Sequence, residues 1–228
     1  MRSISKFSSL LAGLAISSSV AAAQTCLGRP YFSTGPAQVG LTADMGSGIA
    51  AYGAEAAAGV NNSFFGSASI AHARYDRGTL TAPQNSKGTR YGATGGYQWS
   101  LGGQRRTQFC PLVSGTWGSF NMSSPIALHR SEVSAGGSIG YVHPSNRGVH
   151  VVPFAGLAVA RITRELRNTN GDQTNIGRDT YLPVTGGVGV HFENSFMLTG
   201  QITLPVDLDR ADPMLGIRLV VPIGGNRR

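Results

Sequence analysis

Six charged residues fall on the polar faces of alternating segments, a pattern that indicates charge chemistry in an enclosed interior. They are three acids and three arginines: Asp44, Glu55, Glu132, Arg90, Arg130 and Arg218. Groups in such an interior must be paired and hydrogen-bonded, because an isolated buried charge costs several kcal/mol. The pattern predicts a polar network of ion pairs that fixes the shape of the interior. The alternative is a small arginine-lined passage that favours anions.

The two cysteines of the chain, Cys26 and Cys110, are candidates for a disulfide. Disulfides form in oxidising compartments, and Cys110 shares a strand face with Ser114 and Thr116, which would point it inward. We expect a Cys26–Cys110 bond that ties residues 24–35 across one end of the fold as a lid. Neither cysteine has CxxC or metal-ligand spacing, so redox catalysis and a zinc site are not expected.

Two His-x-Ser pairs are candidates for nucleophilic catalysis, His129 with Ser131 and His143 with Ser145. This spacing resembles the His-x-Ser of outer-membrane lipid A deacylases, in which a histidine would serve as base for a serine nucleophile. Such chemistry also needs an acid to orient the histidine. Glu132 would lie on the opposite face from His129 and Ser131, and no carboxylate follows the second pair closely. We therefore expect no enzymatic activity.

Other motifs that bind ligands are absent from the sequence. There is no phosphate-binding glycine loop, no HExxH and no calcium loop, so we expect no cofactor and no metal ion. The net charge is +8, but the basic residues are scattered and form no run or helical face. A nucleic-acid partner is therefore not expected.

The first residues predict export. Arg2 and Lys6 precede an apolar stretch over 7–20 and three alanines at 21–23, which is the pattern of a secretory signal peptide cleaved after residue 23. Beyond it, no run of about 18 apolar residues occurs, so a helical membrane protein is excluded.

Period-two alternation of apolar and polar residues predicts about ten strands in the rest of the chain, each ended by turn-forming residues. The expected strands cover residues 36–46, 49–60, 64–76, 88–101, 107–120, 127–143, 149–166, 179–193, 195–206 and 213–223.

The connections between these strands alternate in length. Those over 77–87 and 167–178 are long and polar, whereas most of the others are short turns. Outer-membrane barrels have short periplasmic turns, longer external loops and an even number of antiparallel strands. We therefore expect an all-β fold, an antiparallel up-and-down transmembrane β-barrel of about ten strands with eight as the fallback. The barrel would cover 36–223, after a periplasmic segment over 24–35 and before a basic tail over 224–228.

A soluble exported ligand-binding β-barrel would alternate in the same way, but with its apolar face inward. Glycines on the polar faces favour the membrane barrel, because such small residues would leave a soluble core full of holes. Aromatic residues near strand ends on the apolar faces are typical of membrane-interface girdles. They are Tyr52, Tyr91, Tyr97, Trp99, Trp117, Tyr141 and Phe192.

Residues 186–198, GGVGVHFENSFML, resemble the penultimate hairpin of small outer-membrane barrels of the OmpA and opacity-protein type. The final strand is similar in part, with Gly216 before Leu219 and Val221, but the chain continues past the point where family members commonly finish on an aromatic residue. The resemblance implies a monomeric, non-catalytic bacterial outer-membrane protein with a structural, surface-interaction or small-solute passage role. Its partners would be outer-membrane lipid and small solutes or surface ligands at loops 77–87 and 167–178. A deacylase-like enzyme and a soluble ligand-binding barrel remain the alternatives.

Overall fold

The computed structural model describes an almost entirely β-stranded chain. It covers residues 25–28, 37–46, 49–60, 63–75, 86–102, 106–121, 126–143, 148–168, 172–192, 195–207 and 213–223. Among these residues no helix is long and apolar enough to cross a bilayer. One turn of 3-10 helix, η2 (Thr25–Leu27), precedes the strands. The strands are β1 (Ala37–Gly46), β2 (Ile49–Val60), β3 (Phe64–Tyr75), β4 (Ser86–Tyr97), β5 (Trp99–Leu101), β6 (Thr107–Asn121), β7 (Ile126–Tyr141), β8 (Val149–Asn168), β9 (Gln173–Phe192), β10 (Met197–Val206) and β11 (Met214–Ile223).

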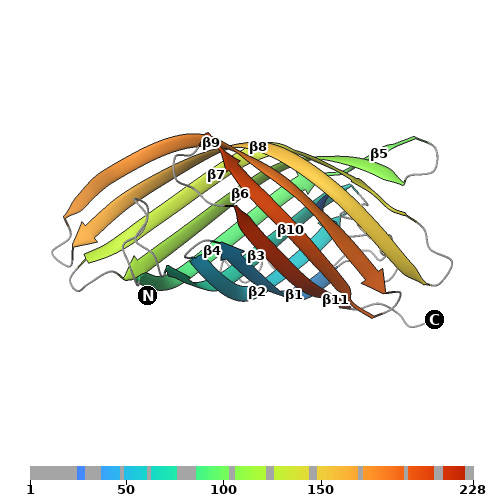
Figure 1. Cartoon of the computed structure of the whole chain (residues 1–228), viewed down its shortest axis with the longest axis horizontal. Coiled ribbons are helices and arrows are strands. Elements are labelled where there is room, and N and C mark those ends of the chain that lie inside the picture. The colour runs from blue at the N-terminus through green and yellow to red at the C-terminus, as the bar shows by residue number, and fades with distance from the viewer. Residues whose placement is uncertain are drawn as a thin grey trace, which may run out of the picture.

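The strands form one closed antiparallel sheet (Figure 1). Strands that follow one another in sequence are neighbours in the sheet, and the ring is completed because β1 pairs with β11 and β4 pairs with β6. This is the expected up-and-down barrel. We call the end where Ala37 opposes Ile223 the terminal end, and the end where Gly46 opposes Met214 the distal end.

The wall of the barrel has ten strands, because β4 and β5 are two parts of one strand that is interrupted at Gln98. Both pair with β6 in one continuous register, in which Gly96 opposes Leu112 and Trp99 opposes Phe109. Pro111 falls opposite Tyr97, next to the interruption, and has no N–H to give to the β4–β6 ladder. On the other side, the Gln98 N–H donates to the Ser63 carbonyl at 2.7 Å and so continues the β3–β4 pairing. The predicted count of ten is therefore confirmed.

The two faces of the sheet differ sharply in polarity. The outward positions of the strands carry large apolar side chains that are exposed; Leu41, for example, is 64% exposed. A soluble protein does not present so continuous an apolar surface to water. The apolar faces therefore point outward, as a membrane barrel requires, and not inward as in the soluble alternative. Members of this exterior include Val39, Leu41, Val113, Val133, Leu157, Val159, Ile202, Leu204, Ile217 and Leu219.

Aromatic side chains collect toward the two ends of this apolar exterior. Near the terminal end, Phe64 and Tyr97 pack edge to face with ring centroids 4.8 Å apart, and Trp99 lies 5.4 Å from Tyr97. Nearer the distal end, Tyr91 opposes Trp117 across the β4–β6 ladder. Amphipathic rings at two levels are typical of the lipid–water interfaces of a membrane barrel.

One predicted loop is wrong. Residues 167–178 were expected as a long external loop, but β8 continues to Asn168 and β9 begins at Gln173. A β-bulge between Arg164 and Glu165 shifts the register there, and it interrupts the period-two alternation that would have indicated a strand. Residues 77–85 of the other predicted loop, 77–87, lie outside the described residues. The last two residues of that loop, 86 and 87, begin β4. The predicted signal peptide (1–23), the tail (224–228) and most of 24–35 also lie outside the described residues.

Replacing Leu41 by arginine tests which solvent the outer face meets. An arginine on the lipid face near the barrel midplane costs about 2–4 kcal/mol, whereas the same change on a water-exposed surface costs little. We expect Leu41→Arg to lower the free energy of unfolding in lipid vesicles by about that amount, measured by urea titration. Leu41→Ala is the control. An unchanged midpoint for the arginine variant would contradict a lipid-facing β1.

Candidate functional site

The inward face of the barrel encloses a cavity of about 330 Å³ in which most of the predicted polar network meets. Five of the six predicted residues line it: Asp44, Arg90, Arg130, Glu132 and Arg218. The sixth, Glu55 on β2, also lies on the inward face and is buried, but it is not part of the cavity lining. Alternation in the sequence therefore located the lining, because every second residue of a barrel strand faces the lumen.

Arg90 and Asp44 form the first ion pair of this lining, between Arg90 Nη2 on β4 and Asp44 Oδ2 on β1. Two strands, β2 and β3, lie between them. The inward residues of those strands at this level are small; an added Cβ at Gly53 would lie only 2.7 Å from the Ala71 Cβ. These small residues leave the space through which the arginine reaches the carboxylate.

Glu132 is the centre of a second group. Arg130 Nη2 donates to Glu132 Oε2 at 3.1 Å, and the Tyr181 hydroxyl donates to Glu132 Oε1 at 2.7 Å. Tyr181 is on β9, and its ladder partner on the intervening β8 is Ala160. This small residue lets the tyrosine reach across. The sequence analysis missed Tyr181, because its position on a polar face was hidden among apolar neighbours.

Sequence reasoning also missed a third ion pair toward the distal end. Arg164 Nη1 lies 2.7 Å from Asp179 Oδ2. Both residues were overlooked because they adjoin the segment that was interpreted as a loop. Hydroxyl pairs link other inward positions, Ser114 with Ser134 at 2.7 Å and Thr185 with Thr203 at 3.0 Å. The lumen is thus largely cross-linked by polar contacts.

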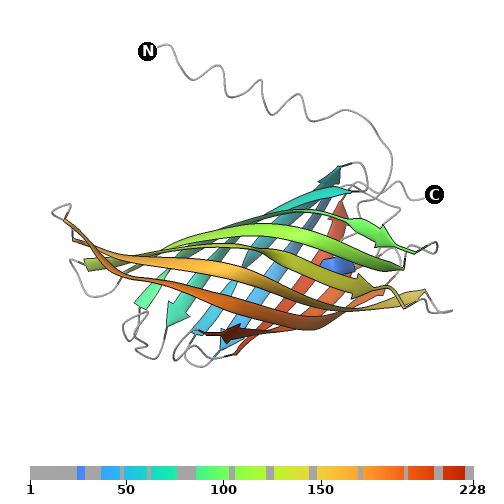
Figure 2. The same cartoon turned by 90° about the horizontal axis from the view of Figure 1, so that it is seen from above.

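The short element η2 lies inside the barrel at its terminal end (Figure 2). Cys26 forms the expected disulfide with Cys110, with the two Cα atoms 5.9 Å apart and 84 residues apart in sequence. Cys26 is fully buried and η2 contacts β6, β7 and β8. The segment was expected as a lid across the mouth, but its described residues 25–28 instead enter the lumen. We call these residues the plug.

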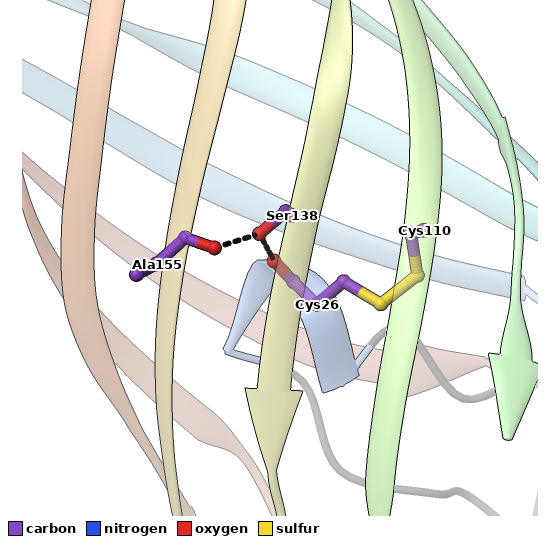
Figure 3. Close-up of a disulfide and its surroundings, with 4 residues drawn as sticks. All are labelled: Cys26, Cys110, Ser138 and Ala155. Carbon is purple, nitrogen blue, oxygen red and sulfur yellow. Dashed lines mark hydrogen bonds between the residues drawn. A yellow bond between two sulfur atoms is a disulfide. The ribbon is translucent and has the colours of Figure 1, made fainter. Parts of the chain in front are cut away.

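Hydrogen bonds and glycines fit the plug into the wall. The Ser138 hydroxyl donates to the Cys26 carbonyl and also contacts the Ala155 carbonyl at 2.9 Å (Figure 3). A Cβ added at Gly189 would lie 1.7 Å from the Gly28 carbonyl oxygen, so only glycine lets the two backbones approach. Gly28 has a φ of +75°, which favours glycine as well.

Apolar side chains narrow the lumen at both ends. At the terminal end, Phe65, Leu27 and Leu112 pack around the disulfide. At the distal end, Phe120 and Leu128 pack with small residues of β2 and β3 into a second buried cluster. The cavity therefore lies between two apolar clusters, one toward each end of the lumen.

A second cavity, of about 290 Å³, opens on the outer face of the barrel. It contains His129 and Ser131 of β7, and the structure places Glu165 of β8 directly opposite His129 in the ladder. The sequence analysis did not pair them, because 36 positions separate the two and the register of β7 with β8 was unknown. Arg167 Nη2 lies 3.5 Å from Glu165 Oε2.

Among the described residues, the structure shows no comparable arrangement for the other His-x-Ser pair or for a metal site of His, Cys, Asp and Glu ligands. His143 forms an isolated bridge with Val151 near the terminal end, and Ser145 lies outside the described residues. Within the described part of the chain, no group of three or more His, Cys, Asp or Glu side chains could hold a metal ion.

Comparison with known proteins supports the fold. The β-domain of the Bordetella autotransporter BrkA is similar, with a TM-score of 0.54 and 13% identity over 83% of this chain and 100% of that chain. The fold is that of an outer-membrane β-barrel. Ail of Yersinia pestis matches less well, with a TM-score of 0.39 and 10% identity over 81% of this chain and 93% of that chain. The sequence matches no protein-family model and no curated relative.

This fold and the apolar exterior together place the barrel in the outer membrane. In that setting the two cavities meet different surroundings. The first lies inside the lumen, between the plug and the distal apolar cluster. The second opens toward lipid in register with Tyr91 and Trp117, the aromatic residues nearer the distal end.

Replacing Gly189 by a larger residue tests whether the plug packs against β9. We expect Gly189→Ala to push Gly28 away and expose the disulfide, because overpacking costs about 1–3 kcal/mol. Thiol release by an external reductant should then become about tenfold faster than in the native protein, for a cost near the lower end of that range. Gly186→Ala is the matched control, since an added Cβ there meets nothing within 4 Å. Equal reduction rates in both variants would contradict the placement of the plug.

Proposed function

We propose that this protein is a non-catalytic outer-membrane barrel whose lumen is closed at rest, with a role in envelope structure and surface contact rather than open diffusion. The observation that carries this proposal is the plug: a disulfide-bonded segment buried inside the lumen. A barrel of ten strands is only slightly wider than the eight-stranded size that side chains fill. One inserted turn of chain therefore occupies a large part of its cross-section.

The lumen contacts support the same proposal. Ion pairs cross from β1 to β4 and from β8 to β9, and the Tyr181–Glu132 bond links β9 to β7. Each of these holds the wall in one shape and removes a charge or polar group that could attract a passing solute. Slow passage of a small solute would require the plug to move.

The unequal strand lengths favour contact at the outer surface. β8 and β9 have 20 residues each, whereas β1, β10 and β11 have 10. A membrane-spanning strand needs about 9–11 residues, so the β8–β9 hairpin is longer than the bilayer requires. The bulge between Arg164 and Glu165 indicates that the extra residues of this hairpin lie toward the distal end. We place the distal end on the extracellular side, because membrane barrels carry their longer connections there, and the β8–β9 hairpin would then stand at the cell surface.

Planar-bilayer recordings test the closed lumen. We expect the native, oxidised protein to give no discrete conductance steps, because the plug occupies the lumen at the terminal end. The double variant Cys26→Ser/Cys110→Ser should give intermittent steps if the plug is the main barrier. A steady conductance of the oxidised native protein would refute the proposal. The single variant Leu41→Ala, on the outer face, controls for effects of refolding.

A second candidate function, hydrolysis of an acyl ester in an outer-leaflet lipid, is favoured by the position of Glu165. The ladder brings Ser119, His129 and Glu165 into one row across β6, β7 and β8, and Ser131 follows on the same outward face two residues after His129. Ser131 as nucleophile, His129 as base and Glu165 as orienting acid would be the components of a catalytic triad on this face.

The chemistry would run as follows. Ser131 Oγ attacks the ester carbonyl carbon while His129 takes its proton, and the tetrahedral intermediate collapses as His129 returns that proton to the departing lipid alkoxide. Water then attacks the acyl-enzyme with His129 as base, which releases a fatty acid and restores Ser131. Glu165 would orient His129, and Arg167 next to Glu165 would face the anionic lipid headgroup.

Fatty-acid release from vesicles that contain lipopolysaccharide tests this second candidate. If it is correct, Ser131→Ala abolishes release, and Glu165→Gln slows it by orders of magnitude because His129 loses its orienting acid. Ser119→Ala is the matched control, since Ser119 lines the same cavity on the other side of His129. An inactive native protein, or equal loss in the Ser119 variant, would reject the triad and leave the non-catalytic proposal in place.

A further inference from the structure

We infer that the terminal end of the lumen holds a binding site for a soft, monovalent metal ion, copper(I), formed by His150, His191 and Met197. These residues lie on three neighbouring strands, β8, β9 and β10. His191 is the direct ladder partner of His150 on one side and of Met197 on the other. The site goes beyond the closed-barrel proposal and does not depend on whether the lumen conducts.

The three side chains share the inward face of the sheet. His191 and Met197 are buried, whereas the next residues in the chain, Phe192 and Leu198, are exposed on the outer face. Successive residues of a strand point to opposite faces, so His191 and Met197 point inward. His150 has the same direction, because directly opposed residues of a ladder lie on one face.

The two imidazole rings lie at a separation that suits a shared ion. Their centroids are 6.0 Å apart, and the ring planes are inclined by 15°. An ion about 2 Å from one nitrogen of each ring would hold the two centroids roughly 5–6 Å apart. Rotation about the Cβ–Cγ bond, whose preference is broad in histidine, turns a nitrogen of each ring toward the other. The pair can therefore bind an ion without a change in the backbone.

Met197 supplies a third ligand of a different kind. Its side chain packs against Val220 of β11, its ladder partner on the side away from His191. A methionine side chain has three rotatable bonds and a polarizable thioether, so the sulfur can turn from Val220 toward His191. No short-spaced motif in the sequence indicates this set, because only the pairing of three strands brings it together.

The chemistry of these donors selects the ion. Thioether sulfur is a soft ligand that favours copper(I), whereas magnesium and calcium take oxygen ligands. Zinc sites in proteins use imidazole, thiolate and carboxylate, and thioether is not among these ligands. Imidazole and thioether are both neutral, so an ion of charge +1 leaves less uncompensated charge in a buried site than a divalent ion does.

The plug bounds the site on the side of the lumen cavity. A Cβ added at Gly189, two residues before His191 on the same face, would lie 1.7 Å from the Gly28 carbonyl oxygen. On the opposite side, the pair of His150 with His191 is the second of the β8–β9 ladder counted from the terminal end. The site therefore lies next to the terminal mouth, with the plug between it and the lumen cavity.

Anaerobic competition with a chromogenic copper(I) chelator tests the inference on the refolded protein in detergent micelles. We expect the native protein to take one copper(I) per chain from the chelator, and an equal amount of zinc should not displace it. Met197→Leu removes the sulfur and keeps the bulk of the side chain. It should weaken binding about tenfold or more, because loss of even an outer-shell partner of a metal costs about 10–100-fold in affinity. His191→Gln should abolish binding.

Two variants are matched controls. Met214→Leu makes the same change at a methionine that lines the lumen cavity. His72→Gln makes the histidine change at a residue that packs against Tyr52, with the ring centroids 5.5 Å apart. Both should bind copper(I) as the native protein does. A thiol assay on the same samples checks that the disulfide stays oxidised, since free thiolates bind copper(I) themselves.

X-ray absorption at the copper edge gives a readout of the ligands that does not depend on affinity. The native protein should show one sulfur ligand, which Met197→Leu should lack. Failure of the native protein to take copper(I), equal affinity in the Met197 and Met214 variants, or a native spectrum without sulfur would overturn the inference. Conductance plays no part in these readouts, so failure of the closed-barrel proposal would be seen separately.

Discussion

The closed hydrogen-bond ladder is the constraint on which the rest of the structure depends. In hydrocarbon every backbone N–H and C=O must find a partner within the protein, so a sheet in the membrane can have no free edge. Pairing of β1 with β11 and of β4 with β6 meets this requirement. Closure also fixes which face of each strand meets lipid, and so it turns alternation in sequence into an apolar exterior and a polar lumen.

The polar lumen then has to be compensated within a narrow space. The protein does this by spacing: glycines and alanines on intervening strands let long side chains reach across to partners, as Arg90 reaches Asp44 and Tyr181 reaches Glu132. The same use of small residues admits the plug, where Gly189 and Gly28 approach backbone to backbone. Among the described residues, Arg218 has no ion-pair partner.

Polar residues interrupt the apolar exterior of the barrel. Most outward positions in the bilayer region are apolar, yet between Tyr91 and Arg167 a cavity opens on the same face whose lining includes His129, Ser131 and Glu165. Polar groups on a lipid-facing surface are costly in the hydrocarbon region and fall in cost toward the interface. Tyr91 and Trp117 line the same cavity, and amphipathic aromatic residues of this kind are typical of lipid–water interfaces.

The sequence by itself predicted the fold class, the count of ten strands and the inward face for six charged residues, because the period of side-chain direction in a strand is two and each face meets one solvent. It also predicted the Cys26–Cys110 bond, from the compartment and the inward face of Cys110. Only the tertiary structure decided which inward groups meet: Tyr181 reaches Glu132 across the small Ala160 of the intervening β8, and Asp179 meets Arg164 on the neighbouring β8. The pairing register of the strands likewise brought Glu165 beside His129 and Thr199 beside Arg218. The tertiary structure also placed the plug inside the lumen rather than over its mouth. Alternation states which face a residue occupies, but the shear and closure of the barrel determine what lies opposite it.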